Sequence, residues 1–279
     1  MNQPSGFQVR GSAPDHYAEF NAPIMAPFVG AVLQRAGISA GDSVLDIACG
    51  TGFTTQRAAE IVGPSGRVVG LDVNPGMLAK ARSMSVGSGV PVTWQEGSAL
   101  DLPFDASEFE RVVCQQGIQF FSDLSRATRE MARVLRPGGS LAVSFWAPLA
   151  DQTYMAAQIT GLLDVLGDVA RPLAAAFELD PALVAEALND AGLENVIVDK
   201  ISAEVILPAD LTEFARGQLM ALPVADAFAA LPPDRQARYL SHVVDTLSGT
   251  RNADGNYRCA FASWVFSAAA ADVVEGAVR

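Results

Sequence analysis

The sequence predicts an α/β fold with a mostly parallel sheet of seven strands. Strand-like apolar segments alternate with helix-like segments through the first half of the chain. The first strand runs into a glycine-rich turn, and acidic residues, Asp46 and Asp72, lie at the ends of the first two strands. These features are typical of an α/β sheet that holds a nucleoside-containing cofactor at its carboxyl edge.

Five strands, with helices between them, are expected before residue 147. The expected strands are Ser43–Ile47, Arg67–Asp72, Val92–Glu96, Phe109–Cys114 and Ser140–Phe145. The expected helices are Thr54–Ile61, Pro75–Ser83 and Leu124–Leu135, with a short or irregular segment near Leu100–Asp105 and a stop at Pro137-Gly138-Gly139. Upstream, Pro23 and Pro27 interrupt the helical spacing of Tyr17–Ala36, which predicts a broken pair of helices.

The pattern changes after Trp146. Helices are expected at Met155–Gly167 and Pro181–Ala191, and Leu211–Leu247 is expected to be helical but broken by Pro223 and Pro232-Pro233. A long sixth strand is expected at Asn195–Leu207 and an antiparallel seventh strand at Tyr257–Ala268. We therefore expect an N-terminal arm and lid helices at 1–39, a cofactor-binding core at 40–208, a helical cap insertion at 209–256, and the final strand and tail at 257–279. The polar segment Met1–Pro14 is expected to be a loose arm.

Composition excludes several classes of function. The net charge of −12 argues against RNA or DNA as substrate, because an acidic surface repels phosphate backbones. The three cysteines are not clustered and there are only two histidines, so we expect neither a disulfide framework nor a metal centre. Without a signal pattern or a long apolar run, we expect a cytoplasmic protein with no membrane span. The sequence leaves the oligomeric state open between a monomer and a homodimer.

The glycine-rich turn lies in the segment Val44–Gly52, VLDIACGTG. Gly50 and Gly52 allow a tight turn and a close approach to a ligand, and the helix that follows presents unpaired amides. Thr55 stands where a dinucleotide fingerprint has its third glycine, and no Lys-Ser/Thr pair follows the turn. These departures favour an adenosine with a short charged tail over a dinucleotide or a nucleoside triphosphate.

Four blocks in order resemble the class I S-adenosylmethionine-dependent methyltransferases. They are VLDIACGTG, VVGLDVNPGML (Val68–Leu78), WQEGSALDLPF (Trp94–Phe104), and the stretch from FERVVCQQGIQFFSD (Phe109–Asp123) to REMARVLRPGGSLAVSFW (Arg129–Trp146). Within that family the chain resembles the broad small-molecule group that includes quinone-biosynthesis C-methyltransferases and many natural-product O-methyltransferases. The resemblance implies a Rossmann-like sheet with helices on both faces, a helical cap, and S-adenosylmethionine as cofactor, released as S-adenosylhomocysteine.

The resemblance also assigns residues to sites. Asp72 would bind the ribose hydroxyls, although it could instead cap the helix that begins at Pro75. Ser98 replaces the acid usual in the family, and either contacts adenine or is a plain loop residue. The implied cofactor site comprises Tyr17, Asp46, Ala48, Cys49, Gly50, Gly52, Asp72, Val73, Asn74, Met77, Gly97, Ser98, Ala99, Gln115 and Gln116, and the implied substrate pocket Gln119, Phe120 and Trp146. The alternative for Phe120 is packing against the following helix, and the alternative for Tyr17 and Trp146 is a place in the core.

The catalytic base is the least determined part of the site. His16 and His242 are the candidates, since transfer to oxygen or nitrogen needs a deprotonated acceptor, but proximity to the sulfonium can also carry the rate. We expect O-methylation (within EC 2.1.1) of a small, largely apolar natural product or quinone-type precursor. A carbon or nitrogen acceptor is the alternative, as is a cofactor-binding protein that transfers no methyl group, either a cyclase-like enzyme or a structural subunit.

Overall fold

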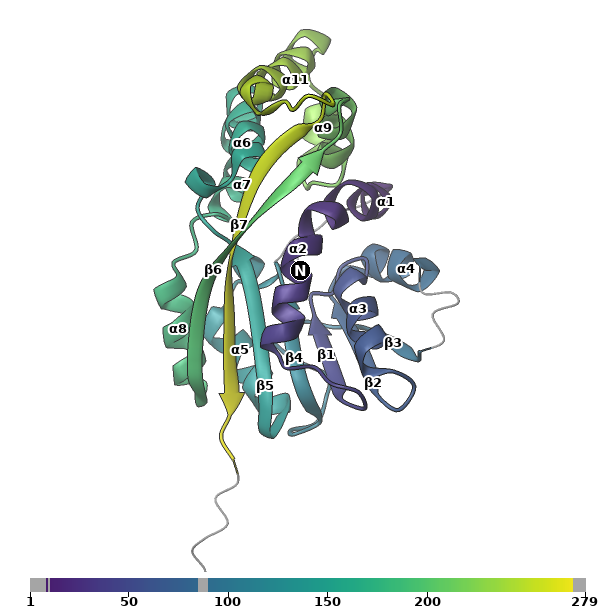
Figure 1. Ribbon diagram of the computed structural model, residues 1–279, viewed down its shortest axis with the longest axis vertical. Helices are drawn as coiled ribbons and strands as arrows, with labels where there is room; N and C mark the ends of the chain where they lie inside the picture. Colours follow the sequence, from purple (N-terminus) through teal and green to yellow (C-terminus); the bar gives the residue numbers. More distant parts are fainter. Residues whose placement is uncertain (1–8, 10, 85–89, 273–279) are drawn as a thin grey trace, which may run out of the picture. The chain divides into compact units, whose positions relative to one another are not determined.

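Seven strands form a single sheet in the computed structural model, which describes residues 9, 11–84 and 90–272. The strand order is β3-β2-β1-β4-β5-β7-β6, with β1 to β5 parallel and the last strands antiparallel, as expected (Figure 1). The strands are β1 Ser43–Ile47, β2 Arg67–Asp72, β3 Val92–Glu96, β4 Phe109–Gln115, β5 Leu135–Trp146, β6 Leu193–Leu207 and β7 Tyr257–Ala270.

Most of the segment Met1–Pro14, expected to be a loose arm, lies outside the described residues.

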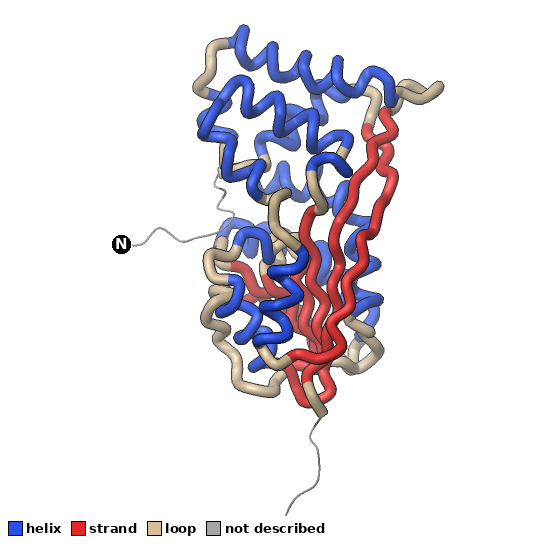
Figure 2. The backbone as a smooth tube through the Cα atoms, turned by 90° about the vertical axis from the view of Figure 1, so that its left-hand side faces the viewer, coloured by secondary structure: helices blue, strands red, loops and turns tan. Residues whose placement is uncertain are grey.

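Helices flank the sheet on both sides (Figure 2). The α-helices are α1 Ala13–His16, α2 Ala22–Arg35, α3 Phe53–Val62, α4 Pro75–Met84, α5 Leu124–Val134, α6 Thr153–Leu166, α7 Arg171–Ala175, α8 Pro181–Asp190, α9 Leu211–Met220, α10 Ala225–Ala229 and α11 Pro233–Leu247. Short 3₁₀ turns are η2 Ile118–Phe120, η3 Leu149–Asp151, η4 Gly167–Ala170 and η5 Ser248–Thr250, and η1 Tyr17–Asn21 is a π-helical turn.

The chain divides into two compact units. The helical unit comprises residues 1–28, 145–179 and 200–264, and the sheet unit comprises residues 29–144, 180–199 and 265–279. Four of the five boundaries between them fall inside α2, β5, β6 and β7, and the fifth lies just before α8. The domain limits expected from the sequence stay a prediction.

The N-terminal helices differ from the expected broken pair. The segments α1, η1 and α2 follow one another without a loop, and Pro27 lies inside α2. Pro23 lies in the first turn of α2, directly after the π-helical turn, and it has no N–H to bond to that turn. The Ala22 amide instead bonds the Tyr17 carbonyl, which closes the wide π-helical turn.

Strand β5 begins earlier than expected. Leu135 pairs with Phe109, but the next pair of this ladder joins Ser140 to Arg111, so residues 136–139 form an irregularity in the strand. Gly138 has a φ of +70°, and a Cβ there would lie 2.6 Å from Asp272 Oδ1. The Pro-Gly-Gly sequence therefore marks a bulge within the strand as well as the end of α5.

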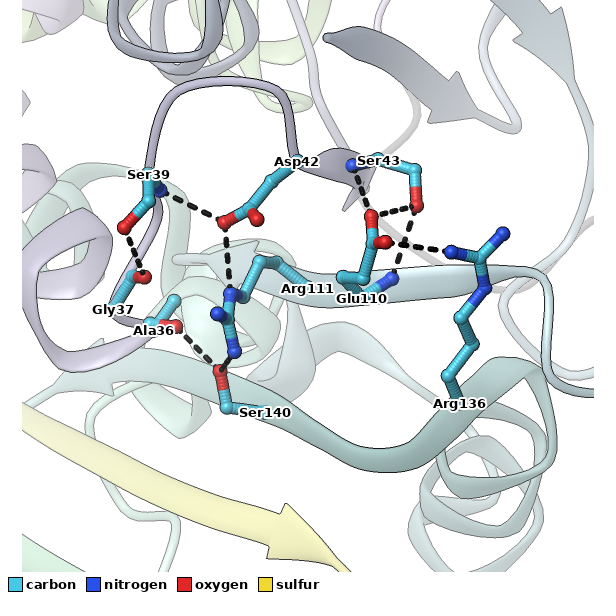
Figure 3. Close-up of polar contacts among 9 residues, drawn as sticks. All are labelled: Ala36, Gly37, Ser39, Asp42, Ser43, Glu110, Arg111, Arg136 and Ser140. Atoms are coloured by element: carbon cyan, nitrogen blue, oxygen red, sulfur yellow. Dashed lines mark hydrogen bonds and ion pairs between the residues drawn. The ribbon is translucent and has the colours of Figure 1, made fainter.

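A polar network ties together the amino ends of β1 and β4 and the irregular start of β5 (Figure 3). Arg111 bridges Asp42 at 2.9 Å and the Ser140 hydroxyl at 3.1 Å. Glu110 accepts from the amide and the hydroxyl of Ser43, both at 2.5 Å, and pairs with Arg136 at 2.6 Å. This network anchors the strands at the sheet edge opposite their carboxyl ends.

Candidate cofactor and active site

The sheet unit has a topological switch point between β1 and β4. The chain proceeds from β1 outward to β2 and β3 on one side, and returns to β4 on the other side. Ligands of open α/β sheets bind outside the carboxyl ends of the strands at such a point. Ala48 (φ 57°) and Gln116 (φ 55°), which follow these two strands, both have left-handed backbones that cost energy for non-glycine residues. Strain at this point is a mark of a functional site.

The glycine-rich turn is held close to a tryptophan ring. Gly50 and Gly52 have positive φ angles, and Gly52 is the N-cap of α3. A Cβ on Gly52 would lie 2.3 Å from Trp94 Cη2, and one on Gly70 would lie 2.5 Å from Trp94 Cζ3. Only glycine fits at these two positions, because the indole packs against the backbone of both segments. The sequence motifs did not indicate this role for Trp94.

Asp46 is 1% exposed and lies beside the glycine-rich turn at the end of β1. Its Oδ2 accepts from the Thr55 hydroxyl at 2.6 Å, whereas Oδ1 is buried and has no hydrogen-bond partner among residues 9, 11–84 and 90–272. Burial raises the pKa of Asp46 from 3.8 to about 7, with a further contribution from the Asp72 carboxylate. The site thus contains a buried acceptor that can receive a hydrogen bond from a cationic or N–H donor.

Asp72 connects the two motif segments. Its Oδ2 accepts from the Gly50 amide and its Oδ1 from the Asn74 amide, both at 2.8 Å. Burial raises its pKa, and these amide bonds oppose the rise. The N-cap of α4 is Asn74, whose Oδ1 accepts from the amides of Gly76 and Met77. Capping of that helix is therefore not the role of Asp72.

The other residues expected near the cofactor, apart from Tyr17, lie in the sheet unit with these acids. Met77 and Ala99 are buried, Val73 and Gln115 are half-buried, and the Gly97 amide bonds the Asp72 carbonyl. The Ser98 hydroxyl accepts from the Leu100 amide at 3.1 Å, so it closes the turn of its own segment. These positions are consistent with the site that the resemblance implies.

Buried thiols accompany the two acids. Burial, with the carboxylates of Asp72 and Asp46, raises the pKa of the Cys49 thiol well above its usual value, and burial also raises that of Cys114. Both side chains are therefore neutral at physiological pH and unsuited to nucleophilic attack.

An amide pair lies beyond β4. Gln119 Nε2 donates to Gln116 Oε1 at 3.1 Å, and in the described chain the buried Gln119 Oε1 has no hydrogen-bond partner. Phe120, at the end of η2, is half-buried. Gln119 therefore presents an acceptor at the carboxyl end of β4.

Four residues expected at the active site lie in the helical unit. Trp146 is buried against Phe28 and Phe177 at ring-centroid distances of 5.6 and 6.2 Å, and Tyr17 is half-buried in η1. His16 Nδ1 is buried and unpartnered within the part of the chain that the structure describes. His242, on α11, lies in the same unit.

The hydrogen bonds of His242 define its tautomer. The Thr160 hydroxyl lies 3.0 Å from His242 Nε2, and it also bonds the Ala156 carbonyl at 2.7 Å. Because a hydroxyl has one proton and the carbonyl can only accept, Nε2 carries the hydrogen that is donated to Thr160. Any basic nitrogen of His242 is therefore Nδ1.

Comparisons with known proteins identify the family. The profile of a methyltransferase domain family (Methyltransf_25) matches residues 44–139. The ubiquinone/menaquinone biosynthesis C-methyltransferase UbiE of Pasteurella multocida is 33% identical over 188 residues, which cover 62% of this chain and 70% of that protein. The chain belongs to the class I S-adenosylmethionine-dependent methyltransferases.

Two further similarities agree with this assignment. The methyltransferase is 42% identical to the UbiE protein of Hahella chejuensis over 113 residues, which cover 40% of this chain and 45% of that protein. It has the fold of the YcgJ protein of Bacillus subtilis, with a TM-score of 0.59, 22% identity, and coverage of 88% and 99% of the two chains. The chain spans a little under half the length of most of the curated relatives it matches.

The site residues fit the family's cofactor. The unpartnered Asp46 Oδ1 suits a donor on the amino-acid part of S-adenosylmethionine, and the carboxylate of Asp72 suits ribose hydroxyls. No group of three or more His, Cys, Asp and Glu side chains among the described residues could hold a metal ion. No described helix has the length and apolar character needed to span a bilayer.

Proposed function

We propose that this methyltransferase methylates a small, largely apolar acceptor, with a hydroxyl oxygen on a natural product or quinone-type precursor as the favoured atom. The observation that carries the proposal is the meeting of Ala48, Gln116 and the two buried acids at the ends of β1, β2 and β4. This is the arrangement that an adenosine cofactor requires at a switch point. A reducing, cytoplasmic setting is part of the proposal, because the cysteines of the described chain are buried and unpaired.

The cofactor supplies an electrophilic methyl group on a sulfonium. In our proposal Asp72 accepts from the ribose hydroxyls while it holds the Gly50 amide, and Asp46 Oδ1 accepts from the amino-acid end. The Thr55 hydroxyl holds the other oxygen of Asp46 and so orients the carboxylate. Ala48, Gly50 and Gly52 offer backbone groups without bulky side chains in the way.

His16 is the favoured base. Its Nδ1 is buried, and within residues 9, 11–84 and 90–272 no group bonds to it, so it is available for the proton of an acceptor hydroxyl. His242, in contrast, already donates from Nε2 to Thr160. A neutral imidazole that removes this proton makes the acceptor oxygen a better nucleophile in the displacement.

Methyl transfer to carbon is the second candidate, and the names of the relatives favour it. The Pasteurella multocida and Hahella chejuensis proteins are both described as C-methyltransferases of quinone biosynthesis. Loss of a proton from a ring hydroxyl also makes the adjacent ring carbons nucleophilic. The same base would therefore serve either reaction.

The proposal is tested by incubating the protein with trideuteromethyl-labelled S-adenosylmethionine and either 2-naphthol or 1,4-naphthohydroquinone. Mass spectrometry measures transfer, and NMR distinguishes a methoxy group from a methyl group on carbon. A labelled methoxy product supports the favoured reaction, and a ring methyl supports the second. Binding of S-adenosylhomocysteine without transfer to either compound would contradict the proposal and favour a protein that binds the cofactor without methylating.

A further inference from the structure

Two pairs of buried side chains connect α6 and α9 within the helical unit. The rings of Tyr154 and Phe214 meet edge to face at 5.5 Å. One turn further along each helix, the Gln158 amide donates to Gln218 Oε1. Tyr154 is 0% exposed, and the two glutamines are each 1% exposed. An aromatic layer and an amide layer therefore lie next to each other in the interior of this unit.

Two buried polar atoms of this unit lack partners. Neither the Tyr154 hydroxyl nor Asn21 Oδ1 has a hydrogen-bond partner among the described groups of the protein, and Asn21 is only 4% exposed. A buried polar atom that stays unsatisfied is costly, so native proteins rarely leave one without a role. Here one atom can donate and the other can accept.

Aromatic rings connect the segment that carries Asn21 to Tyr154. Asn21 follows Phe20, whose ring packs edge to face against Phe214 at 5.9 Å, and Phe214 packs in turn on Tyr154. The His16 ring stacks on the Phe20 ring, with 6.0 Å between the ring centroids and 28° between the ring planes. The proposed base thus lies at one end of a continuous aromatic array.

The backbone is specialised to hold Phe20 in this array. Phe20 and Asn21 lie in the π-helical turn η1. Such turns are rare in proteins, and those that occur are often found at functional sites. On α9, a Cβ at Gly217 would lie 2.3 Å from the Phe20 ring. Glycine at this position is what allows the ring to pack against the helix.

We infer that Phe20, Asn21, Tyr154 and Phe214 recognise a planar aromatic acceptor that carries a hydroxyl or carbonyl oxygen. Aromatic side chains bind a flat ring by stacking or edge contact. The Tyr154 hydroxyl donates to the oxygen of the bound ring, and Asn21 Oδ1 accepts from a ring hydroxyl. The inference rests on the proposed function and specifies its substrate class as phenols and quinols.

The test is a calorimetric titration of the full chain with 2-naphthol, and with naphthalene as a probe that lacks the oxygen. Tyr154→Phe removes only the hydroxyl, and Asn21→Ala removes the acceptor. Tyr257→Phe is the matched control, because Tyr257 is buried in the same unit but its ring lies beside Arg251. Each protein is also titrated with S-adenosylhomocysteine, and its melting temperature is measured without ligand.

We expect the wild-type protein to bind 2-naphthol more tightly than naphthalene. Tyr154→Phe and Asn21→Ala should each weaken 2-naphthol binding about tenfold and leave S-adenosylhomocysteine binding unchanged. Tyr257→Phe should change neither. Unchanged 2-naphthol affinity in Tyr154→Phe, with a lowered melting temperature, would show a structural hydroxyl and overturn the inference. So would equal affinity of the wild type for the two probes. If the wild type does not bind S-adenosylhomocysteine, that result would instead contradict the proposed function.

Discussion

Gly117 and Ala48 lie against each other beyond the adjacent strands β4 and β1. A Cβ on Gly117 would be 2.7 Å from the Ala48 Cβ, and 2.8 Å from Cys114 Sγ. Carbon atoms that are not bonded cannot approach so closely, so Gly117 keeps the strained Ala48 turn in place. The two loops of the switch point therefore support each other.

Gly117→Ala should lower the free energy of unfolding by about 1–3 kcal/mol, because the added methyl group overpacks this contact. It should also weaken S-adenosylhomocysteine binding, since Ala48 would have to move. Urea unfolding and calorimetry measure the two effects. Gly30→Ala is the control: nothing lies within 4 Å of a Cβ there, and it lies inside α2, where alanine is preferred. If Gly117→Ala and Gly30→Ala have the same free energy of unfolding and the same S-adenosylhomocysteine affinity, the contact between Gly117 and Ala48 is unimportant.

Asp46 should make the stability of the cofactor-free protein depend on pH. Its pKa rises from 3.8 to about 7 on folding, so between these values the folded protein keeps a proton that the unfolded chain has released. Its contribution to stability is therefore full below about pH 4, decreases as the pH rises to about 7, and then levels off.

Asp46→Asn should remove this dependence. Relative to the variant, the wild type should lose on the order of 2 kcal/mol of stability between about pH 5 and about pH 8. Urea unfolding at both pH values measures the difference. Asp168→Asn, at an exposed aspartate of η4, is the control and should follow the wild type. A constant difference between Asp46→Asn and the wild type would refute the buried, raised-pKa carboxyl.

Glu110 should have the opposite pH dependence. Hydrogen bonds from Ser43, with a contribution from Arg136, lower the pKa of its carboxyl, so its contribution is present above the usual pKa and is lost as the pH falls through the lowered one. Glu110→Gln should cost under about 1 kcal/mol at neutral pH, since the side chain is partly exposed to solvent screening.

The wild type and Glu110→Gln should converge in stability once the carboxyl is protonated. Thermal unfolding over the acidic range measures this convergence. Glu204→Gln, which breaks an exposed pair with Arg258, is the control and should have little effect at any pH. A difference in melting temperature between the wild type and Glu110→Gln that persists at low pH would assign the effect to packing rather than to the ionised carboxylate.

The two histidines should differ in their effect on methyl transfer. His16→Ala should reduce the turnover of 2-naphthol about 100-fold without changing S-adenosylhomocysteine affinity, because it removes the proposed base. His242→Ala should retain most of the activity, since its Nε2 is committed to Thr160. Initial rates of methyl transfer across a range of pH measure the turnover of both variants. Full turnover by both variants would show that alignment with the cofactor suffices and that neither residue is a base.

The strands and the two motif acids could be predicted from the sequence because their signals are local. Parallel strands end at the same edge, so Asp46 and Asp72 had to be neighbours once the alternation was recognised. The partners of these groups could not be predicted, because the Asp46–Thr55 bond and the packing of Trp94 on Gly52 depend on tertiary contacts. Gly70 inside a strand is a sequence signal that indicates a close approach.

The irregular regions were predicted least well. The Pro137-Gly138-Gly139 segment ends a helix, as expected, but its bulge within β5 depends on pairing with β4. The π-helical turn before Ala22 and the aromatic array on Phe20 combine segments that are far apart in the sequence. Periodicity does not report contacts of this kind.

The most direct test of cofactor binding at the switch point is calorimetric titration with S-adenosylhomocysteine of the wild type and Asp72→Asn. We predict binding on the order of micromolar for the wild type, and affinity more than about tenfold weaker for Asp72→Asn, which loses the charge on the group that accepts from the Gly50 amide and that we propose to accept from the ribose hydroxyls. No binding by the wild type, or equal affinity in the variant, would contradict the account.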